Sequence, residues 1–265
     1  MKIRINKDMG TQFPDGQKIF KLGNRWPTTA VFQYIWSWDT LQLLIGAKKV
    51  MDNFGVKCHL HIKYMYGMRA DRKFNPGEPA YFKDVIAPLI NNLKFETVST
   101  FDTHSDVVEA CIDRIQIRSR KDLVNRVVEK IKKEPTPKTV CLVVPDAGAV
   151  KKSHDIAGFF DSILYATKHR DIKTGEVSYN PITNLPTADN YLIVDDICDG
   201  GATFLALAKE IRKVNINARV SLYVSHGLFS KGLDALRPVF TNIYTTNSVN
   251  FDMKSELNFH VENVW

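Results

Sequence analysis

The sequence contains few cysteines and no long apolar run, and both absences exclude classes of protein. Its four cysteines, at positions 58, 111, 141 and 198, lie far apart and include no C-x-x-C pair, which argues against a zinc ribbon and against a disulfide framework. No window approaches the ~18 uncharged apolar residues of a membrane span, and the first residues lack the apolar segment of a signal peptide. We therefore expect reduced thiols in a cytoplasmic protein that does not contact the membrane.

Low-complexity segments and a strong excess of one charge are also absent. Hydrophobic residues make up 44% and charged residues 25% of the 265 residues, as in ordinary folded proteins. The net charge of +7 is mild, and the basic residues do not show the clustering with stacking aromatics that nucleic-acid binding requires. We expect one large domain or two smaller ones, and no nucleic-acid partner.

Short apolar runs alternate with segments of helical periodicity along the chain. The expected strands include residues 29–35, 58–64, 139–144, 191–194 and 220–224, and the segments 124–131 and 204–211 have the apolar spacing of amphipathic helices. This alternation predicts an α/β fold with mainly parallel sheets flanked by helices.

Two polar segments interrupt this alternation. Residues 133–138 contain Pro135 and Pro137, which would end a helix and stiffen a crossing between domains. We place the boundary there, giving an N-terminal α/β domain 1–134 and a C-terminal α/β domain 135–265. The alternative is an ordinary loop from a helix to a strand within one sheet. Residues 168–190 form a second polar stretch, whose length is typical of a lid or binding loop.

The most specific pattern joins an expected strand to an expected helix. It is Tyr191-Leu-Ile-Val-Asp195-Asp196-Ile-Cys-Asp199-Gly200-Gly201-Ala202-Thr203. A turn of small residues before a helix directs backbone N–H groups and the positive helix end toward a phosphate, and the Thr203 hydroxyl adds a donor. Asp195 and Asp196 suit sugar hydroxyls, which donate to carboxylates. The pattern fits a ribose phosphate; the alternative is a tight turn whose acids only cap the helix. No Gly-Lys-Ser/Thr follows, which excludes a Walker loop.

This string resembles the phosphoribosyl-diphosphate (PRPP) binding signature that type I phosphoribosyltransferases share with ribose-phosphate diphosphokinase, also called PRPP synthetase. Further segments resemble the synthetase in that family's order. They are Phe13-Pro-Asp-Gly-Gln17, Tyr66-Gly-Met-Arg-Ala-Asp-Arg-Lys73, Asp102-Thr-His-Ser105, Val144-Pro-Asp-Ala-Gly-Ala-Val-Lys-Lys152 and Thr167-Lys-His-Arg170 followed by Gly175-Glu-Val177. The resemblance covers about residues 13–246 and implies two similar phosphoribosyltransferase-like domains with the active site at the C-terminal ends of strands.

The resemblance implies a role for each of these segments. The implied ATP-binding residues are Phe13, Asp15, Gln17, Arg69, Asp71 and His104, and His104 and Asp146 are the implied metal-associated residues. Lys168 and Arg170 are the implied catalytic cations, placed on a loop that closes over the reacting phosphates. The implied ribose 5-phosphate residues are Asp195, Asp196, Asp199, Gly200, Gly201, Ala202 and Thr203. Without the resemblance, the basic segments would be solvated loops, His104 a polar residue at the sheet rim, and Asp146 a helix cap.

The implied reaction transfers the diphosphoryl group of Mg–ATP to the C1 hydroxyl of ribose 5-phosphate, giving PRPP and AMP. Mg²⁺ is the implied cofactor, and an ATP site completed by a neighbouring subunit implies a homo-oligomer. Gln17 and Ala70 stand where the family has glutamate and glutamine, so nucleotide preference and regulation stay open. Two alternative functions are a phosphoribosyltransferase that consumes PRPP and a non-catalytic regulatory partner of an active synthetase.

Overall fold

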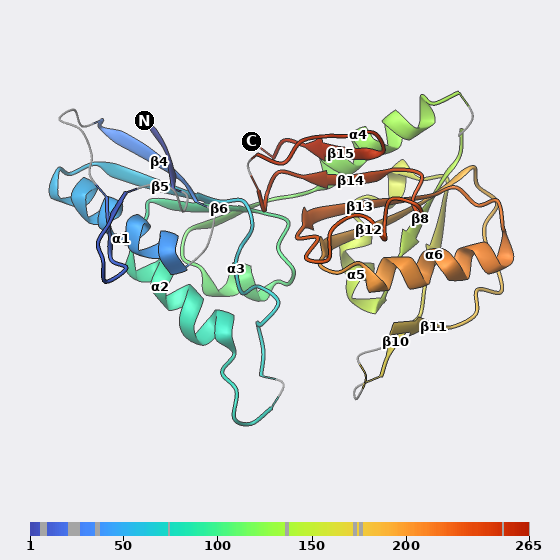
Figure 1. Cartoon of the computed structure of the whole chain (residues 1–265), viewed down its shortest axis with the longest axis horizontal. Coiled ribbons are helices and arrows are strands. Elements are labelled where there is room, and N and C mark those ends of the chain that lie inside the picture. The colour runs from blue at the N-terminus through green and yellow to red at the C-terminus, as the bar shows by residue number, and fades with distance from the viewer. Residues whose placement is uncertain are drawn as a thin grey trace. The chain divides into compact units, whose positions relative to one another are not determined.

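The computed structural model describes residues 1–5, 10–20, 27–34, 38–73, 75–135, 138–171, 174, 177–250 and 252–264. The chain forms two compact units, residues 1–119 and 120–265 (Figure 1). The division comes before helix α4, Lys121–Lys132, whereas the sequence placed it after residue 134. The reason is that α4 packs against strand β8 of the second unit, and its Lys132 forms an ion pair of 2.8 Å with Asp161. The boundary therefore moves to 119/120; Thr136 and Pro137 of the predicted linker lie outside the described residues.

The first unit is built on a five-stranded parallel sheet. Its strand order is β1-β4-β5-β6-β7, with β1 Lys2–Ile5, β4 Thr29–Tyr34, β5 Lys57–Ile62, β6 Thr97–Phe101 and β7 Ile115–Arg118. The helical segments are α1 Trp38–Asn53, η1 Phe82–Ile86, α2 Ala87–Asn92 and α3 Val107–Cys111, and a small hairpin pairs β2 Thr11–Gln12 with β3 Lys18–Ile19. The order of the five strands follows the chain from one edge to the other.

The second unit is built on a six-stranded parallel sheet with a different kind of order. The order is β15-β14-β13-β12-β8-β9, with β8 Val140–Val144, β9 Ser162–Tyr165, β12 Asn190–Cys198, β13 Val220–Gly227, β14 Ile243–Thr246 and β15 Phe259–Glu262. From β8 the chain first adds β9 on one side and later β12 on the other. Parallel sheets bind ligands beyond the carboxyl ends of the strands at such a reversal, which here lies between β8 and β12.

The remaining elements of the second unit surround this reversal. They are α5 Ala147–Ser153, the short 3-10 helix η2 Ala157–Phe159, α6 Ala202–Val214, and a hairpin of β10 Lys168–Arg170 with β11 Val177–Tyr179. Strand β11 packs against α6, so the hairpin lies beside that helix (Figure 1). The stretch predicted as a long loop thus contains paired strands.

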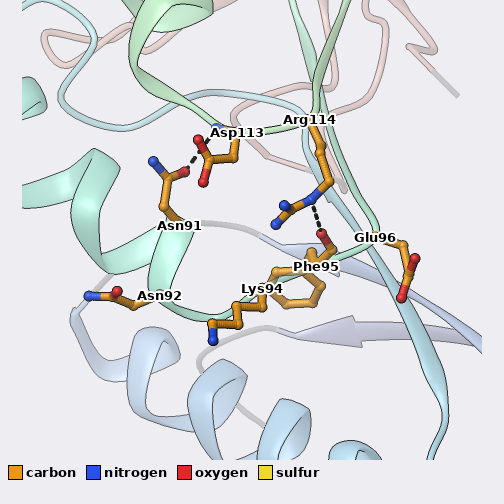
Figure 2. A pocket seen from close by; sticks show the side chains of 7 residues that line it. All are labelled: Asn91, Asn92, Lys94, Phe95, Glu96, Asp113 and Arg114. Carbon is orange, nitrogen blue, oxygen red and sulfur yellow. Dashed lines mark hydrogen bonds between the residues drawn. The ribbon is translucent and has the colours of Figure 1, made fainter.

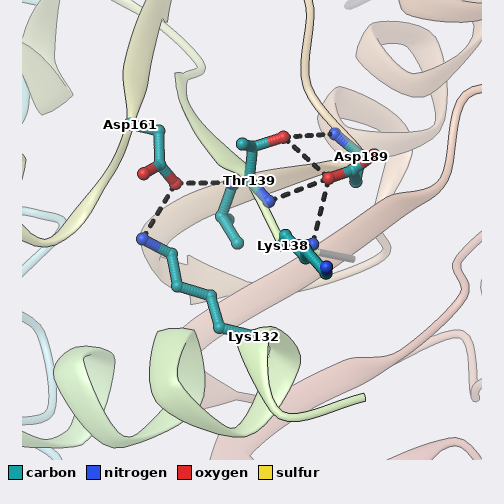
Figure 3. A network of polar contacts seen from close by, with 6 residues as sticks. Lys132, Lys138, Thr139, Asp161 and Asp189 are labelled. Carbon is teal, nitrogen blue, oxygen red and sulfur yellow. Dashed lines mark hydrogen bonds and ion pairs between the residues drawn. The ribbon is translucent and has the colours of Figure 1, made fainter. Parts of the chain in front are cut away.

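Two carboxylates accept hydrogen bonds from the backbone at the start of β8, at the edge of the second sheet away from the strand C-termini (Figure 3). Asp189 accepts hydrogen bonds from the backbone N–H groups of Lys138 (3.0 Å) and Thr139 (2.9 Å). Asp161 accepts one of 2.8 Å from the N–H of Val140 in addition to its ion pair with Lys132. These bonds lower the pKa of Asp189, with the Thr139 N–H as the largest cause. The beginning of β8 is therefore held to both neighbouring strands.

The predicted α/β class with mainly parallel sheets is confirmed, and two strands are longer than predicted. Strand β12 continues through both carboxylates to Cys198, because Asp195, Ile197 and Cys198 pair with β13. Strand β13 continues to Gly227. Residue Ile35 of the first predicted strand lies outside the described residues. No helix in the described part of the chain is both long and apolar enough to span a membrane.

Candidate functional site

The turn between β12 and α6 has the geometry of an anion-binding loop. Gly201 precedes the helix with φ +82°, a left-handed conformation that only glycine adopts without strain. A β-carbon there would lie 2.7 Å from Cδ2 of Leu236, so the local space also requires glycine. The Phe204 N–H donates to the Gly201 carbonyl at 3.1 Å. The N–H groups of Ala202 and Thr203 precede this bond, at the helix end where N–H groups have no partner within the helix.

The segment after β13 covers this turn. The N–H groups of Leu228 and Phe229 both donate to the carbonyl of Cys198, at 2.8 and 3.2 Å. The Ser230 hydroxyl forms a hydrogen bond with the Asp199 carboxylate. The Lys231 side chain runs along Gly200, where a β-carbon would lie 3.1 Å from Lys231 Cδ. A cationic side chain is therefore placed beside the predicted phosphate loop.

Asp195 and Asp196 occupy different electrostatic environments although they are adjacent. Asp196 is buried and its Oδ2 lies 3.0 Å from Nζ of Lys152. Burial and then the negative charge of Asp196 raise the pKa of Asp195 to about 8. The Asp196 N–H, which donates to Asp195 Oδ1 at 2.9 Å, and the charge of Arg120 offset only part of this increase. In the free protein Asp195 therefore favours its protonated form more than an exposed carboxyl does.

Asp146 follows β8 and carries two contacts. Its Oδ1 accepts a 3.1 Å hydrogen bond from the N–H of Ala149 and caps α5, so the capping interpretation is correct for the geometry. Its Oδ2 forms an ion pair with Nζ of Lys168, the first predicted catalytic cation. The charge of Asp146 also contributes to the raised pKa of Asp195. The second unit thus gathers Asp146, Lys168 and Asp195 at one end of its sheet; the side chain of Arg170 lies outside the described residues.

Two predicted ATP segments meet in the first unit. They follow the neighbouring strands β5 and β6, and the N–H of His104 donates to Sδ of buried Met68 at 3.3 Å. The side chains of Arg69 and His104 are exposed, and Asp71 is half-buried. Hence the strand ends bring an exposed guanidinium and an exposed imidazole onto adjoining loops.

The remaining predicted ATP residues form a separate turn between β2 and β3. Asp15 Oδ1 accepts a 3.0 Å hydrogen bond from the N–H of Gln17, and Phe13 is 46% exposed. The Lys18 N–H donates to Gln42 Oε1 of α1 at 3.0 Å, which attaches the hairpin to that helix. The aromatic ring is accessible at this turn, and its use by a neighbouring subunit stays a prediction.

The predicted metal residues belong to different units. Among the described residues no group of three or more His, Cys, Asp and Glu side chains is arranged to hold a metal ion. Mg²⁺ is typically bound by one or two carboxylates, with phosphates and waters completing its shell. Asp146, a single partly exposed carboxylate at the end of β8, fits an ion that arrives with a polyphosphate.

A separate cavity of about 450 Å³ lies in the first unit (Figure 2). Its lining residues are Asn91, Asn92, Lys94, Phe95, Glu96, Asp113 and Arg114. They precede β6 and β7, so the cavity lies at the opposite sheet edge from the predicted ATP loops. Asn91 Oδ1 accepts from the Asp113 N–H at 3.0 Å, and Arg114 Nε donates to the Phe95 carbonyl at 2.7 Å. These polar groups stabilise the turns that form the cavity.

Three residues of the second unit adjoin the candidate site without having been assigned a role from the sequence: Lys152, Tyr179 and Lys231. Lys152 ends the segment 144–152, but its partner Asp196 lies on strand β12, and no local pattern indicates that pairing. Lys231 contacts the loop only because the segment after β13 folds back on it. Tyr179 follows a short polar run that gave no strand signal.

Comparison with known proteins identifies relatives for most of the chain, although no protein-family model matches it. The ribose-phosphate pyrophosphokinase of Rhizobium meliloti is 27% identical over 199 residues, covering 72% of this chain and 61% of the relative. A protein of the same name from Mycoplasma genitalium is 30% identical over 196 residues, covering 72% of this chain and 57% of the relative. The chain therefore matches about three fifths of these relatives' length.

Among solved structures, phosphoribosylpyrophosphate synthetase from Mycobacterium smegmatis superimposes with a TM-score of 0.78. The match covers 97% of this chain and 85% of that one, at 16% sequence identity. This similarity shows a shared fold across both units, and it agrees with the phosphoribosyltransferase-like architecture expected from the sequence.

Proposed function

Because this chain is related by sequence to the ribose-phosphate pyrophosphokinases and shares the fold of a phosphoribosylpyrophosphate synthetase, we propose that it makes PRPP and AMP from ribose 5-phosphate and ATP. The observation that carries the proposal is the β12–α6 junction. There, paired carboxylates and a glycine-dependent helix start lie next to the strand reversal. This arrangement offers acceptors for sugar hydroxyls and N–H donors for a phosphate within one turn.

Ribose 5-phosphate binds along this junction in the proposed complex. Its phosphate accepts hydrogen bonds from the N–H groups of Ala202 and Thr203 and from the Thr203 hydroxyl, while Asp199, Gly200 and Gly201 shape the loop. Its ring hydroxyls donate to Asp195 and Asp196. Lys152 forms an ion pair with Asp196 and holds that carboxylate in place beside Asp195.

ATP is held by the first unit in the proposal, with Arg69, Asp71 and His104 at the phosphates. Phe13, Asp15 and Gln17 contact the base of a nucleotide bound by a neighbouring subunit, so a homo-oligomer is part of the proposal. In the second unit Asp146 would hold Mg²⁺ together with phosphate oxygens, and the ion would supply positive charge to the triphosphate. His104 of the first unit stays a predicted metal-associated residue. Lys168 and Arg170 stabilise the negative charge that develops on the transferred group.

The proposed reaction is an in-line displacement. The C1 hydroxyl oxygen attacks the β-phosphorus, the bond from that phosphorus to the α–β bridging oxygen breaks, and AMP leaves with the bonding electrons. The hydroxyl proton passes to solvent, and no side chain acts as a general base in this proposal. As the substrates bind, Lys168 leaves the Asp146 carboxylate and pairs with phosphoryl oxygens. Most of the catalysis in this proposal comes from positioning the substrates and stabilising their charge.

Isotope transfer tests the proposed reaction. The protein is incubated with ribose 5-phosphate, Mg²⁺ and ATP labelled at the β-phosphorus, and the products are separated by chromatography. We expect label in the sugar diphosphate and equal amounts of AMP and PRPP. Label in ADP would indicate attack at the γ-phosphorus and contradict the proposal.

The same preparation distinguishes the alternatives. Consumption of PRPP with a free nucleobase would identify a phosphoribosyltransferase. No turnover with Mg²⁺ or Mn²⁺, in a protein that still activates or inhibits a known synthetase, would identify a regulatory partner. Light scattering with and without ATP measures the oligomeric state, for which we expect more than one subunit.

A further inference from the structure

Tyr179 carries a buried hydroxyl that the proposed function does not use. The residue ends β11, is 8% exposed, and its ring packs in the core of the second unit with residues of α6 such as Phe204 and Leu207. Its hydroxyl oxygen is buried without a hydrogen-bond partner in the described part of the chain. Buried polar groups are nearly always paired, and an unpaired one calls for a specific cause.

The strand register directs this hydroxyl toward the candidate site. Tyr179 lies directly opposite Lys168 in the antiparallel hairpin, and side chains of such partners project from the same face. Lys168 reaches the Asp146 carboxylate from that face. The Tyr179 side chain therefore extends on the side of the hairpin where Asp146 is located.

Electrostatics agrees with this direction. After burial, the negative charges of Asp146 and Asp195 are the causes that raise the pKa of Tyr179, so both carboxylates lie near the phenol. The hydroxyl stays protonated at neutral pH and is available as a donor. The two carboxylates that raise its pKa are the one proposed for sugar hydroxyls and the one proposed for the metal and phosphates.

We propose that Tyr179 binds the sugar substrate, donating its hydroxyl hydrogen to an oxygen at the reacting end of ribose 5-phosphate, between Asp195 and Asp146. This assignment rests on the proposed function, because it takes ribose 5-phosphate as the ligand of the β12–α6 junction. In the complex the phenol gains the partner that it lacks in the free protein.

The variant Tyr179→Phe tests the assignment, with Tyr191→Phe as the matched control. Tyr191 is also buried, but its hydroxyl donates to the Pro186 carbonyl at 2.7 Å. Calorimetry measures the melting temperature of each free protein and the affinity for ribose 5-phosphate and for Mg–ATP. For Tyr179→Phe we expect an unchanged or higher melting temperature and about tenfold weaker sugar-phosphate binding, the effect of one neutral hydrogen bond. For Tyr191→Phe we expect a lower melting temperature and unchanged affinities.

Steady-state kinetics adds a second readout. Tyr179→Phe should raise the KM for ribose 5-phosphate more than the KM for ATP. If wild type binds ribose 5-phosphate and Tyr179→Phe binds it equally well, the assignment is wrong while the proposed function stands. A lower melting temperature with unchanged affinity would make the hydroxyl structural and also overturn the assignment. If wild type does not bind ribose 5-phosphate at all, the proposed function fails and this assignment fails with it.

Discussion

The two units contain the same kind of parallel sheet but differ in the order in which the chain adds strands to it. In the second unit β9 and β12 are added on opposite sides of β8, whereas the described strands of the first unit follow the chain from edge to edge. The loops at a reversal diverge to opposite faces and leave room for a ligand. The second unit therefore has a binding position built into its topology, and the first depends on the loops after β5 and β6.

The difference extends to the side chains. In the second unit direct contacts link Asp146 to Lys168 and Asp196 to Lys152. In the first unit the N–H of His104 donates to Sδ of Met68 and so joins two predicted ATP segments. We therefore predict that the second unit binds the sugar phosphate by itself, while nucleotide binding needs further components. Separate variants in each unit can test this division.

The largest effect is expected from Lys168→Ala, because this cation is proposed to stabilise charge that appears only in the transition state. Turnover should fall by about 10²–10³-fold with little change in the affinity for either substrate. Steady-state kinetics and calorimetry measure the two quantities. Lys213→Ala, which removes a lysine paired with Glu210 on α6, is the control and should retain wild-type turnover. A loss below about threefold in Lys168→Ala would exclude it as a catalytic cation.

The next largest effect is expected from Gly201→Val, because the left-handed backbone and the contact with Leu236 leave no room for a side chain. Binding of ribose 5-phosphate should weaken by about 100-fold, as the loss of charge-assisted hydrogen bonds implies, and ATP binding should change far less. Gly158→Ala, at an open position with no neighbouring atom within 4 Å, is the control. Circular dichroism verifies the fold. Equal losses for both ligands would contradict a division between the units.

A smaller effect is expected from Arg69→Ala in the first unit, and here ATP binding should be the one that weakens. Loss of one phosphate-binding guanidinium should weaken ATP binding by about tenfold and leave the affinity for ribose 5-phosphate unchanged. Titration calorimetry with each ligand measures this selectivity. Lys83→Ala, which removes an exposed cation from η1, should bind both ligands as wild type does. Weaker sugar-phosphate binding in Arg69→Ala would show that the two sites are not separable.

The last prediction concerns the pH dependence of stability, with no ligand present. The folded protein holds a proton on Asp195 up to about pH 8, whereas the unfolded chain loses it near pH 4. The folded state therefore binds more protons between these values, and stability should fall as pH rises through that window, by at most about 1.4 kcal/mol per pH unit. Urea unfolding at pH 5 and pH 8 should show a smaller decrease for Asp195→Asn than for wild type. Identical pH dependence would mean that Asp195 is ionised throughout.

The sequence predicted the fold class and the family relationship, because both depend on local patterns. The apolar run before Asp195 and the small residues after it are contiguous, and the structure confirms a strand, a turn and a helix there. The roles of the individual site residues stay predictions. The proximity of Lys168 to Asp146 was not predicted, since it depends on a hairpin whose short polar strands lack an alternating apolar pattern.

The domain boundary is a second feature that local sequence patterns did not predict correctly. The prolines at 135 and 137 indicated an interruption, but the helix before them belongs with the sheet after them. Its apolar stripe, with Val124, Val127 and Ile131 buried, is visible in the sequence; the sheet that receives it is not. Amphipathic periodicity predicts that a face is buried without indicating the partner.

The cross-strand register of the β10–β11 hairpin also has a consequence for timing. Lys168 and Tyr179 are fixed opposite one another, and a slip of one residue would turn one of them away from the site. If both act as proposed, a single hairpin presents to the substrates both the cation that stabilises charge and the hydroxyl that recognises the sugar. ATP alone offers phosphate oxygens for Lys168 but no sugar oxygen for Tyr179. We therefore expect Lys168 to stay paired with Asp146 until ribose 5-phosphate binds. Such a hairpin would make the enzyme a poor ATPase, protecting the nucleotide from water whenever the acceptor is absent.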